Sequence, residues 1–353
     1  MRQLAGCLLL LALFGAGSFA RAQQRPDVPA QPDSPVPSPP PASQSDVAGP
    51  PAPAPWLDRL HRGTYDIVWR SAMRIDRMFG SRYDERAYQQ ITGSVAPALL
   101  WDEFDGYDTR FRFNINLPLP RMNERFNAFV GRVDPDEYIS ERSQQSGAFR
   151  RQYGPRSTDE TLLGISYIEP RKKGIRFDAG TGVRLRSSPD PYVKGGLVYE
   201  KGSMEGVLFG WRETAFWQPS EGAGVTTRFD LDRYTKHSWL LRWTSSGTFS
   251  QKSDGLKGYS SLMALHGLSD RRAIAFAVGL DGETDADVPL RDYGTKVAYR
   301  QQISRDWLVM EIRTSLTWPR EELTQARKPS WGVGIGFEML FGTDDFLARP
   351  VTF

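Results

Sequence analysis

The stretch that decides the fold of this 353-residue chain is Trp331-Gly332-Val333-Gly334-Ile335-Gly336-Phe337-Glu338-Met339-Leu340-Phe341, close to its C-terminus. Every second residue is apolar, and most of the residues between are glycine or charged. Because strand side chains alternate between two faces, a period of two predicts a strand with one apolar face. This stretch is about as long as a tilted strand that crosses the hydrocarbon layer of a bilayer.

The same alternation recurs from about residue 90 onward, each time in a segment that is followed by a turn. We predict fourteen strands, at 91–102, 108–118, 125–133, 159–169, 174–186, 191–201, 205–218, 223–234, 237–249, 257–269, 271–283, 291–303, 306–318 and 329–341. Two of these segments, 125–133 and 257–269, are ambiguous in phase, so twelve strands is the alternative.

The connections between the predicted strands alternate in length. Those after even-numbered strands are short, whereas the longer and more polar ones, such as 134–158 and 319–328, follow odd-numbered strands. Membrane β-barrels have short periplasmic turns and longer outside loops. The sequence therefore predicts an all-β fold, a transmembrane antiparallel up-and-down β-barrel over 90–342, with Trp307 and Trp318 at opposite membrane boundaries. Similar rim positions are open to Trp217, Trp239, Trp243 and Trp331. The 134–158 loop is long enough either to fold into the lumen as a constriction or to stay at the surface.

The N-terminal part of the chain differs from the barrel in composition. An apolar run over 4–14 and the motif Ala20-Arg21-Ala22 predict a signal peptide over 1–22. Residues 23–55 hold 12 of the 25 prolines and predict a disordered linker. The only cysteine, Cys7, lies in the signal peptide, so the mature chain has no disulfide and no cysteine ligand for a metal. Residues 343–353 form a C-terminal tail.

Residues 56–80 predict a short amphipathic helix in the periplasm. Apolar residues fall on one side of it and arginines lie between them. Three roles are open for this helix: covering the periplasmic mouth of the barrel, plugging the lumen, or lying on the inner leaflet of the outer membrane.

The chain resembles Gram-negative outer-membrane β-barrel proteins of a family without an assigned substrate. The resemblance rests on Arg305-Asp306-Trp307-Leu308, on Trp318-Pro319-Arg320 and on the closing strand, in which Gly336, Met339 and Phe341 match the C-terminal signal read by the barrel-assembly machinery. It implies a place in the bacterial outer membrane with the N-terminal segment in the periplasm. It also implies contact with outer-membrane lipid, lipopolysaccharide and the assembly machinery.

If the apolar face of each strand contacts lipid, the alternate residues face the lumen. Twelve of these are basic, namely Arg110, Arg112, Arg176, Arg184, Arg186, Lys194, Arg212, Arg228, Arg242, Lys296, Arg300 and Arg313. Six are acidic, namely Asp178, Glu200, Asp230, Asp232, Asp292 and Glu311. Charges in a barrel interior either pair with one another or line water, because an unpaired buried charge is very costly.

Two readings of this lumen remain open. An excess of positive charge around water favours a porin-like channel for small polar solutes, anions above all. Alternatively, Arg–Asp and Arg–Glu pairs fill a closed barrel with a structural or accessory role. Fourteen strands enclose more space than side chains fill, which favours the channel.

The third reading is a lipid-modifying enzyme, which needs a nucleophile and a base side by side. His266 precedes Ser269 by three residues, so a regular strand puts them on opposite faces. We therefore expect no enzyme, with His266 in the lumen or at the rim. The acidic segment 281–287 lacks the spacing of a calcium loop and predicts a solvated outer loop. No cofactor, metal or nucleic-acid partner is expected.

Overall fold

The structure is a computed structural model that describes residues 58, 92–119, 125–141, 159–170, 172–203, 206–235 and 239–342. The predicted signal peptide, proline-rich linker and C-terminal tail lie outside these residues, as does the 56–80 helix apart from Asp58. They remain predictions.

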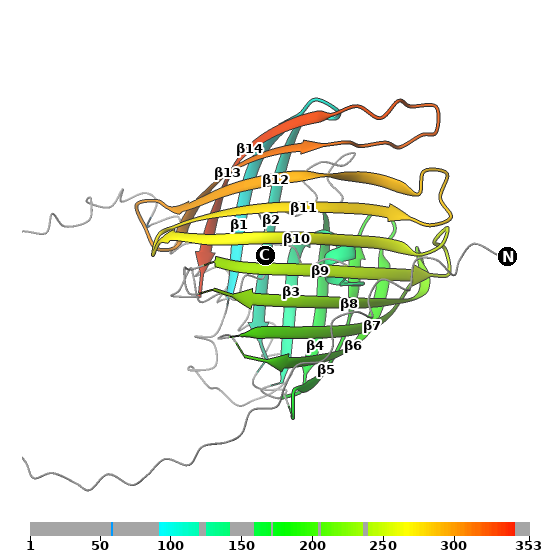
Figure 1. Ribbon diagram of the computed structural model, residues 1–353. Coiled ribbons are helices and arrows are strands. Elements are labelled where there is room, and N and C mark those ends of the chain that lie inside the picture. The colour runs from blue at the N-terminus through cyan, green and yellow to red at the C-terminus, as the bar shows by residue number, and fades with distance from the viewer. Residues whose placement is uncertain are drawn as a thin grey trace, which may run out of the picture. The chain divides into compact units, whose positions relative to one another are not determined.

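The described residues form a closed barrel of fourteen antiparallel strands (Figure 1). The strands are β1 (Thr92–Asp102), β2 (Gly106–Pro118), β3 (Phe126–Val133), β4 (Glu160–Ile168), β5 (Ile175–Leu185), β6 (Asp190–Gly202), β7 (Val207–Gln218), β8 (Gly222–Tyr234), β9 (Trp239–Ser250), β10 (Lys257–Ser269), β11 (Arg272–Glu283), β12 (Leu290–Gln302), β13 (Leu308–Thr317) and β14 (Ser330–Phe341). Each pairs with its neighbours in sequence, and β14 pairs with β1. The prediction of fourteen strands is confirmed and the alternative of twelve is wrong, because both ambiguous segments, now β3 and β10, are strands.

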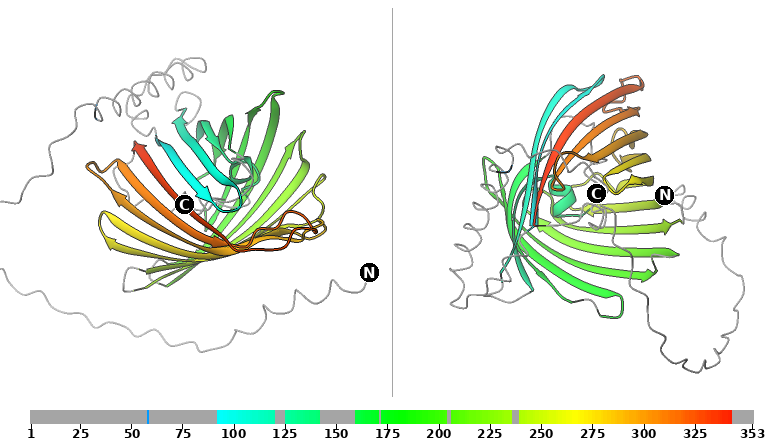
Figure 2. Two further views of the ribbon diagram at one scale, coloured as in Figure 1. Left: turned by 90° about the horizontal axis from the view of Figure 1, so that it is seen from above. Right: turned by 90° about the vertical axis from the view of Figure 1, so that its left-hand side faces the viewer.

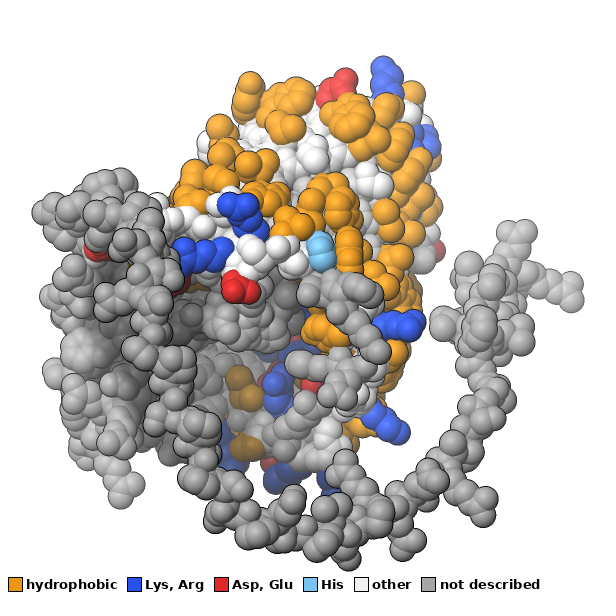
Figure 3. Space-filling model, turned by 60° about the vertical axis from the view of Figure 1, so that its left-hand side comes forward, with side chains coloured by type: hydrophobic (Ala, Val, Ile, Leu, Met, Phe, Trp, Pro, Cys, Tyr) orange, Lys and Arg blue, Asp and Glu red, His pale blue; other side chains and the backbone are white. Residues whose placement is uncertain are grey.

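The outer face of the barrel is apolar. Large hydrophobic side chains are exposed there on strand after strand, for example Phe111 at 52%, Phe177 at 54%, Leu262 at 54% and Val333 at 52%. They form a broad hydrophobic surface in Figure 3. Soluble monomers rarely expose a contiguous apolar patch of this extent, whereas hydrocarbon is a matching solvent for it. The barrel is thus built to cross a membrane.

Aromatic side chains mark one edge of this apolar surface. Trp318 stacks on Tyr293, with ring centroids 5.4 Å apart, and Trp331 is 57% exposed. Trp243 does not lie at a rim: it lies within β9, opposite Leu231 and Leu262, and donates to Ser260 Oγ at 3.2 Å.

The pairing of β14 with β1 closes the barrel. The register is constant on either side of Ala96–Pro97, where the ladder is interrupted because proline has no N–H to donate. The glycines of β14 face the lumen, and a Cβ at Gly334 would lie 2.3 Å from Leu100 Cδ2. Leu100 is 1% exposed. Glycine at this position therefore gives Leu100 the space that it fills.

Among the residues that the structure describes, the only helix longer than one residue is α3 (Pro135–Tyr138), which lies between β3 and β4. No helix in the described part of the chain is long and apolar enough to cross a membrane.

Gly182→Ala should destabilise the barrel. A Cβ at this position on β5 would lie 2.0 Å from the Leu163 carbonyl oxygen and 2.7 Å from Gly164 Cα, both in the β4 backbone. Overpacking of this kind costs about 1–3 kcal/mol, so the denaturant midpoint, followed by circular dichroism, should fall. Gly195→Ala on β6 is the matched control, because a Cβ there meets nothing within 4 Å. Equal midpoints for the two variants would contradict this packing.

Candidate functional site

The predicted lumen residues lie on the inward face of the strands. Residues directly opposite in an antiparallel ladder share a face, and Arg228 on β8 stands opposite Arg212 on β7 and Ser246 on β9. The basic side chains among them are largely covered, from 7% exposed for Arg110 to 18% for Arg242. Arg186 differs because it follows the last residue of β5, and its side chain is 43% exposed.

Several predicted bases and acids form ion pairs with one another. Arg212 donates to Asp178 at 2.9 Å, and Arg228 donates to Asp230 at 2.8 Å. Arg242 and Asp232 are joined by two hydrogen bonds of 2.7 and 2.6 Å. Arg300 and Arg313 share Glu311. These pairs are the ladder that one sequence-based reading expected.

Sequence reasoning missed further acids that pair with the predicted bases. They are Asp108 with Arg110, Asp159 with Arg112, Glu160 with both Arg184 and Arg186, Asp190 with Arg184, Glu141 with Lys194 and Arg212, and Glu338 with Arg300. Among the described residues, the excess of positive charge predicted for the lumen is therefore largely offset. Glu338 could have been found, because it lies on the inward face of β14. Glu141 could not, because its loop has no periodicity.

The first part of the loop between β3 and β4 folds into the lumen. Asp134 caps α3, accepting from the Asp136 N–H at 2.9 Å, and α3 lies within the ring of strands (Figure 2). Beyond α3, Glu141 has a φ of 55°. The predicted alternative of a surface loop is therefore wrong for 134–141, whereas 142–158 lie outside the described residues.

Glu141 anchors this loop to the barrel wall. Its carboxylate accepts a hydrogen bond from Lys194 Nζ on β6 at 2.8 Å and one from Thr214 Oγ1 on β7 at 3.2 Å, and it forms an ion pair with Arg212. Lys194 also donates to the carbonyl oxygen of Tyr138 in α3 at 2.5 Å. One carboxylate and one ammonium thus connect the loop to two adjacent strands.

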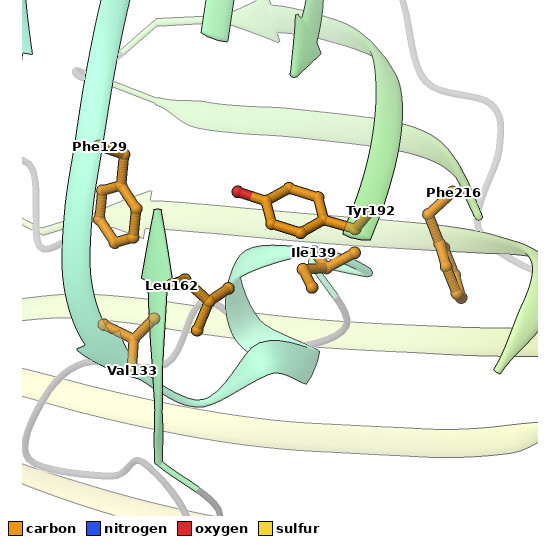
Figure 4. Packing of buried hydrophobic residues seen from close by; sticks show 6 residues of the cluster. All are labelled: Phe129, Val133, Ile139, Leu162, Tyr192 and Phe216. Carbon is orange, nitrogen blue, oxygen red and sulfur yellow. The ribbon is translucent and has the colours of Figure 1, made fainter. Parts of the chain in front are cut away.

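A hydrophobic cluster beside these ion pairs packs the loop against the wall. Its buried members are Phe129, Val133, Ile139, Leu162, Tyr192 and Phe216 (Figure 4). Ile139 from the loop is 0% exposed, and Tyr138 stacks on Phe129 with centroids 4.0 Å apart. Burying one such aliphatic side chain stabilises the fold by about 1.5–3 kcal/mol. The sequence predicted a polar lumen, and at this wall the prediction is wrong because the inward loop supplies apolar partners.

The arc of wall formed by β7 to β9 carries neutral hydroxyl groups as well as charges. Thr226 and Thr248 share a hydrogen bond of 2.9 Å, and Thr244 donates to Asp230 at 2.7 Å. Hydroxyls both donate and accept, so this arc offers either kind of partner to a polar solute or to water.

The sequence-predicted candidates for other chemistry lie away from the lumen. His266 stacks on Trp239, with centroids 4.5 Å apart, near the β10–β11 turn, and it is opposite Ile274 on the outer face. Its predicted lumen position is wrong, and its rim position is confirmed. In the acidic 281–287 segment, Glu283 pairs with Arg291 at 2.8 Å. The described residues contain no group of three His, Cys, Asp or Glu side chains that could hold a metal ion.

The sequence matches no protein-family model and no curated protein. Similar solved structures include OprB from Pseudomonas putida at high pH (12% identity, TM-score 0.44, 72% of this chain and 94% of that chain). An anion-selective porin from Comamonas acidovorans has 10% identity and a TM-score of 0.40, over 71% of this chain and 98% of that one. A loop-deletion mutant of OmpT, an outer membrane protein of Vibrio cholerae, has 8% identity and a TM-score of 0.41, over 71% and 98%.

Glu141→Gln should detach the inward loop. It removes the charge that pairs with Lys194 and Arg212 inside the barrel, and breaking a buried ion pair from one side costs about 3–5 kcal/mol. We expect the free energy of unfolding at neutral pH to fall by about this amount. Glu169→Gln is the control, because Glu169 pairs at 3.2 Å with Lys172, whose side chain is 79% exposed. Such a surface pair contributes about 0–1 kcal/mol, so an effect as large as that of Glu141→Gln would contradict the anchor.

The stability that Glu141 contributes should depend on pH. Burial by itself raises the pKa of this carboxyl, but the nearby charges of Lys194 and Arg212 outweigh burial and hold the pKa below its ordinary value. A carboxyl with a lowered folded-state pKa stabilises the fold above its unfolded-state pKa, about 4.3, and loses this contribution as the pH falls through the folded value. The difference between wild type and Glu141→Gln should persist from pH 7 to about pH 5 and shrink only in stronger acid. A difference that vanishes at about pH 6 would contradict the lowered pKa.

Proposed function

We propose that this protein is an outer-membrane channel for the passive diffusion of small polar solutes. The observation that carries the proposal is a closed fourteen-stranded barrel with an apolar outer face and a charged, hydroxyl-bearing inner face. Eight strands are just filled by their own side chains, whereas a wider barrel encloses space for water. An inner surface that suits water and an outer surface that suits hydrocarbon together favour an aqueous path across a bilayer.

The inward loop supports a narrowed path rather than a wide one. Residues 134–141 occupy part of the lumen beside β6 and β7, held by Glu141 and by the cluster around Ile139. A loop fixed in this way sets the width and the local field of the remaining space. We therefore propose an upper size limit set by this loop, so that small solutes pass and large ones do not.

The proposed solutes are polar, and anions are the charged class that the lumen bases would attract. Carboxylates that pair with those bases weaken the attraction, since a paired arginine contributes little field at a distance. Arg176 on β5 differs from the paired arginines because it forms no ion pair with a carboxylate among the described residues, and its buried Nε has no hydrogen-bond partner there. We propose a mild preference for anions, to which Arg176 contributes.

A closed structural barrel is the second candidate, and one observation favours it. The basic side chains of the lumen are covered to a degree typical of side chains that fill space, for example 7% exposed for Arg184 and 9% for Lys194. Pairs packed this closely would hold the barrel together without an open path. A lipid-modifying enzyme ranks third, since His266 lies against Trp239 on the outer face.

We propose that the N-terminal segment lies in the periplasm, on the side of the short turns. A contact made by Asp58 supports a position of the 56–80 helix at the periplasmic mouth of the barrel. Its carboxylate accepts two hydrogen bonds of 2.9 Å from Arg305 in the β12–β13 turn. Outer-membrane lipid and lipopolysaccharide are the proposed surroundings. Gly336, Met339 and Phe341 are the proposed signal for the barrel-assembly machinery.

Single-channel conductance of the refolded protein in a planar bilayer tests the proposal. Wild type should conduct steadily, and Glu141→Gln should conduct more because the inward loop is released from the wall. Silence from protein shown to be folded, in both forms, would favour the closed barrel instead.

Ion selectivity under a salt gradient can be shifted in both directions at one ion pair. Asp232→Asn leaves the charge of Arg242 without this carboxylate and should move the reversal potential toward anion selectivity. Arg242→Gln leaves Asp232 without its two hydrogen bonds and should move it toward cation selectivity. If both variants conduct and their reversal potentials shift in the same direction, or do not shift, this ion pair does not face the conducting path.

A further inference from the structure

The rim formed by the long β13–β14 loop carries arginines that are held by backbone carbonyls instead of by carboxylates. Arg327 donates from Nη1 to the Trp318 carbonyl oxygen and from Nη2 to the Leu290 carbonyl oxygen. Arg320 donates from Nε to the Glu322 carbonyl oxygen at 3.1 Å and from Nη2 to that of Leu323. Carbonyls satisfy N–H groups but carry no net charge. Neither guanidinium forms an ion pair with a carboxylate among the described residues, and the charge of Arg327 acts on Asp292 only from a longer distance.

The two arginines lie at the same end of β12. The backbone N–H of Arg320 donates to the carbonyl oxygen of Arg291 at 2.8 Å. The guanidinium of Arg327 donates to the carbonyl oxygen of Leu290, the residue before Arg291. Lys328 beside Arg327 is exposed. A guanidinium has five N–H donors. The guanidinium groups of Arg320 and Arg327 each use two of these donors for carbonyl oxygens. The remaining donors, on a side chain already fixed in position, match the bidentate geometry of a phosphate.

An aromatic and apolar surface continues directly from these charges toward the membrane. Arg327 lies over the Tyr293 ring, 5.2 Å from its centroid, and Tyr293 stacks on Trp318. On the neighbouring strand Trp331 is exposed beside them, as is Val333 two residues further along β14. A ligand that is anionic at one end and apolar along its length would satisfy both parts of this surface. A free anion or an acidic protein segment would use only the charged part.

The opposite rim is arranged differently. There Arg271 forms an ion pair with Asp306 at 3.1 Å, and Arg305 forms one with Asp58 at 2.9 Å. At the long-loop rim the carboxylate of Glu322 accepts from Thr324 instead of pairing with an arginine, and that of Glu283 pairs with Arg291. Two arginines at the opposite rim thus pair with carboxylates, whereas Arg320 and Arg327 form no ion pair among the residues that the structure describes.

We propose that Arg320, Arg327 and Lys328, together with Tyr293, Trp318 and Trp331, form a binding surface for a phosphorylated lipid. In the orientation proposed above, this rim faces the outer leaflet, and the lipid is lipopolysaccharide, bound through the phosphates of its lipid A part. The inference rests on that orientation but not on conduction, so a barrel that is silent in a planar bilayer leaves it unchanged.

Native mass spectrometry of the full-length protein, titrated with bisphosphorylated lipid A, tests the proposal. Wild type should bind this lipid in a salt-dependent way and should prefer it over dephosphorylated lipid A. The double variant Arg320→Gln/Arg327→Gln should lose about tenfold or more in affinity, because charge-assisted hydrogen bonds are lost. Arg271→Gln, at the opposite rim, is the matched control and should bind as wild type does.

Two further arms keep the test decisive. The double variant also loses its hydrogen bonds to four backbone carbonyls, which could change the loop itself. Lys328 makes no such hydrogen bond among the described residues, so Lys328→Gln removes a charge without this loss and should weaken binding by a smaller factor. Equal affinity of wild type and a folded double variant, or no preference for the phosphorylated lipid, would overturn the proposal. Displacement of the lipid by excess inorganic phosphate would assign the arginines to a free anion. Equal binding of phosphatidylglycerol would remove the assignment to lipopolysaccharide.

Discussion

The backbone hydrogen bonds between β14 and β1 are the interaction on which the rest of this structure depends. Hydrocarbon offers no partner to an N–H or a carbonyl, so a sheet that crosses a membrane must have no free edge. The seam achieves this with one constant register from Gly93–Phe341 to Asp102–Gly332, in spite of the interruption at Pro97. Because the sheet is closed, every residue is committed to one of two faces, and the position of each lumen charge follows from its place in the alternation.

Closure also explains why so much of the fold could be predicted from the sequence. Lipid outside and polar surroundings inside impose a period of two on every strand, so even strands with weak patterns, such as β10, were found within a residue or two of their ends. The same reasoning could have placed Glu338 in the lumen, because its phase within β14 is unambiguous. It failed for Trp243, because a tryptophan in a strand carries no signal of its depth in the membrane.

The candidate site could be predicted only in part, for a different physical reason. Periodicity says which way a strand residue points but nothing about what a loop places opposite it. Glu141 and Ile139 lie in the 134–158 connection, yet they decide which charges of β6 and β7 are paired and which apolar residues of the wall are covered. Leu162 faces the lumen and is fully buried because the inward loop supplies its contacts. Local sequence has no means of specifying such a contact between distant segments.

The distribution of charge partners separates the inside of the barrel from its long-loop rim. Inside, where the surroundings are less polar than bulk water, an arginine without a carboxylate would be costly, and Arg212 or Arg242 accordingly pairs with an acid on its own wall or on the inward loop. At the rim, where water and lipid headgroups are both in reach, Arg320 and Arg327 keep their charge and use neutral carbonyls only for position. In the proposed binding surface, these fixed cations meet an anion that arrives from outside the protein. The same residue type therefore stabilises the lumen wall in one place and presents charge to the surroundings in the other.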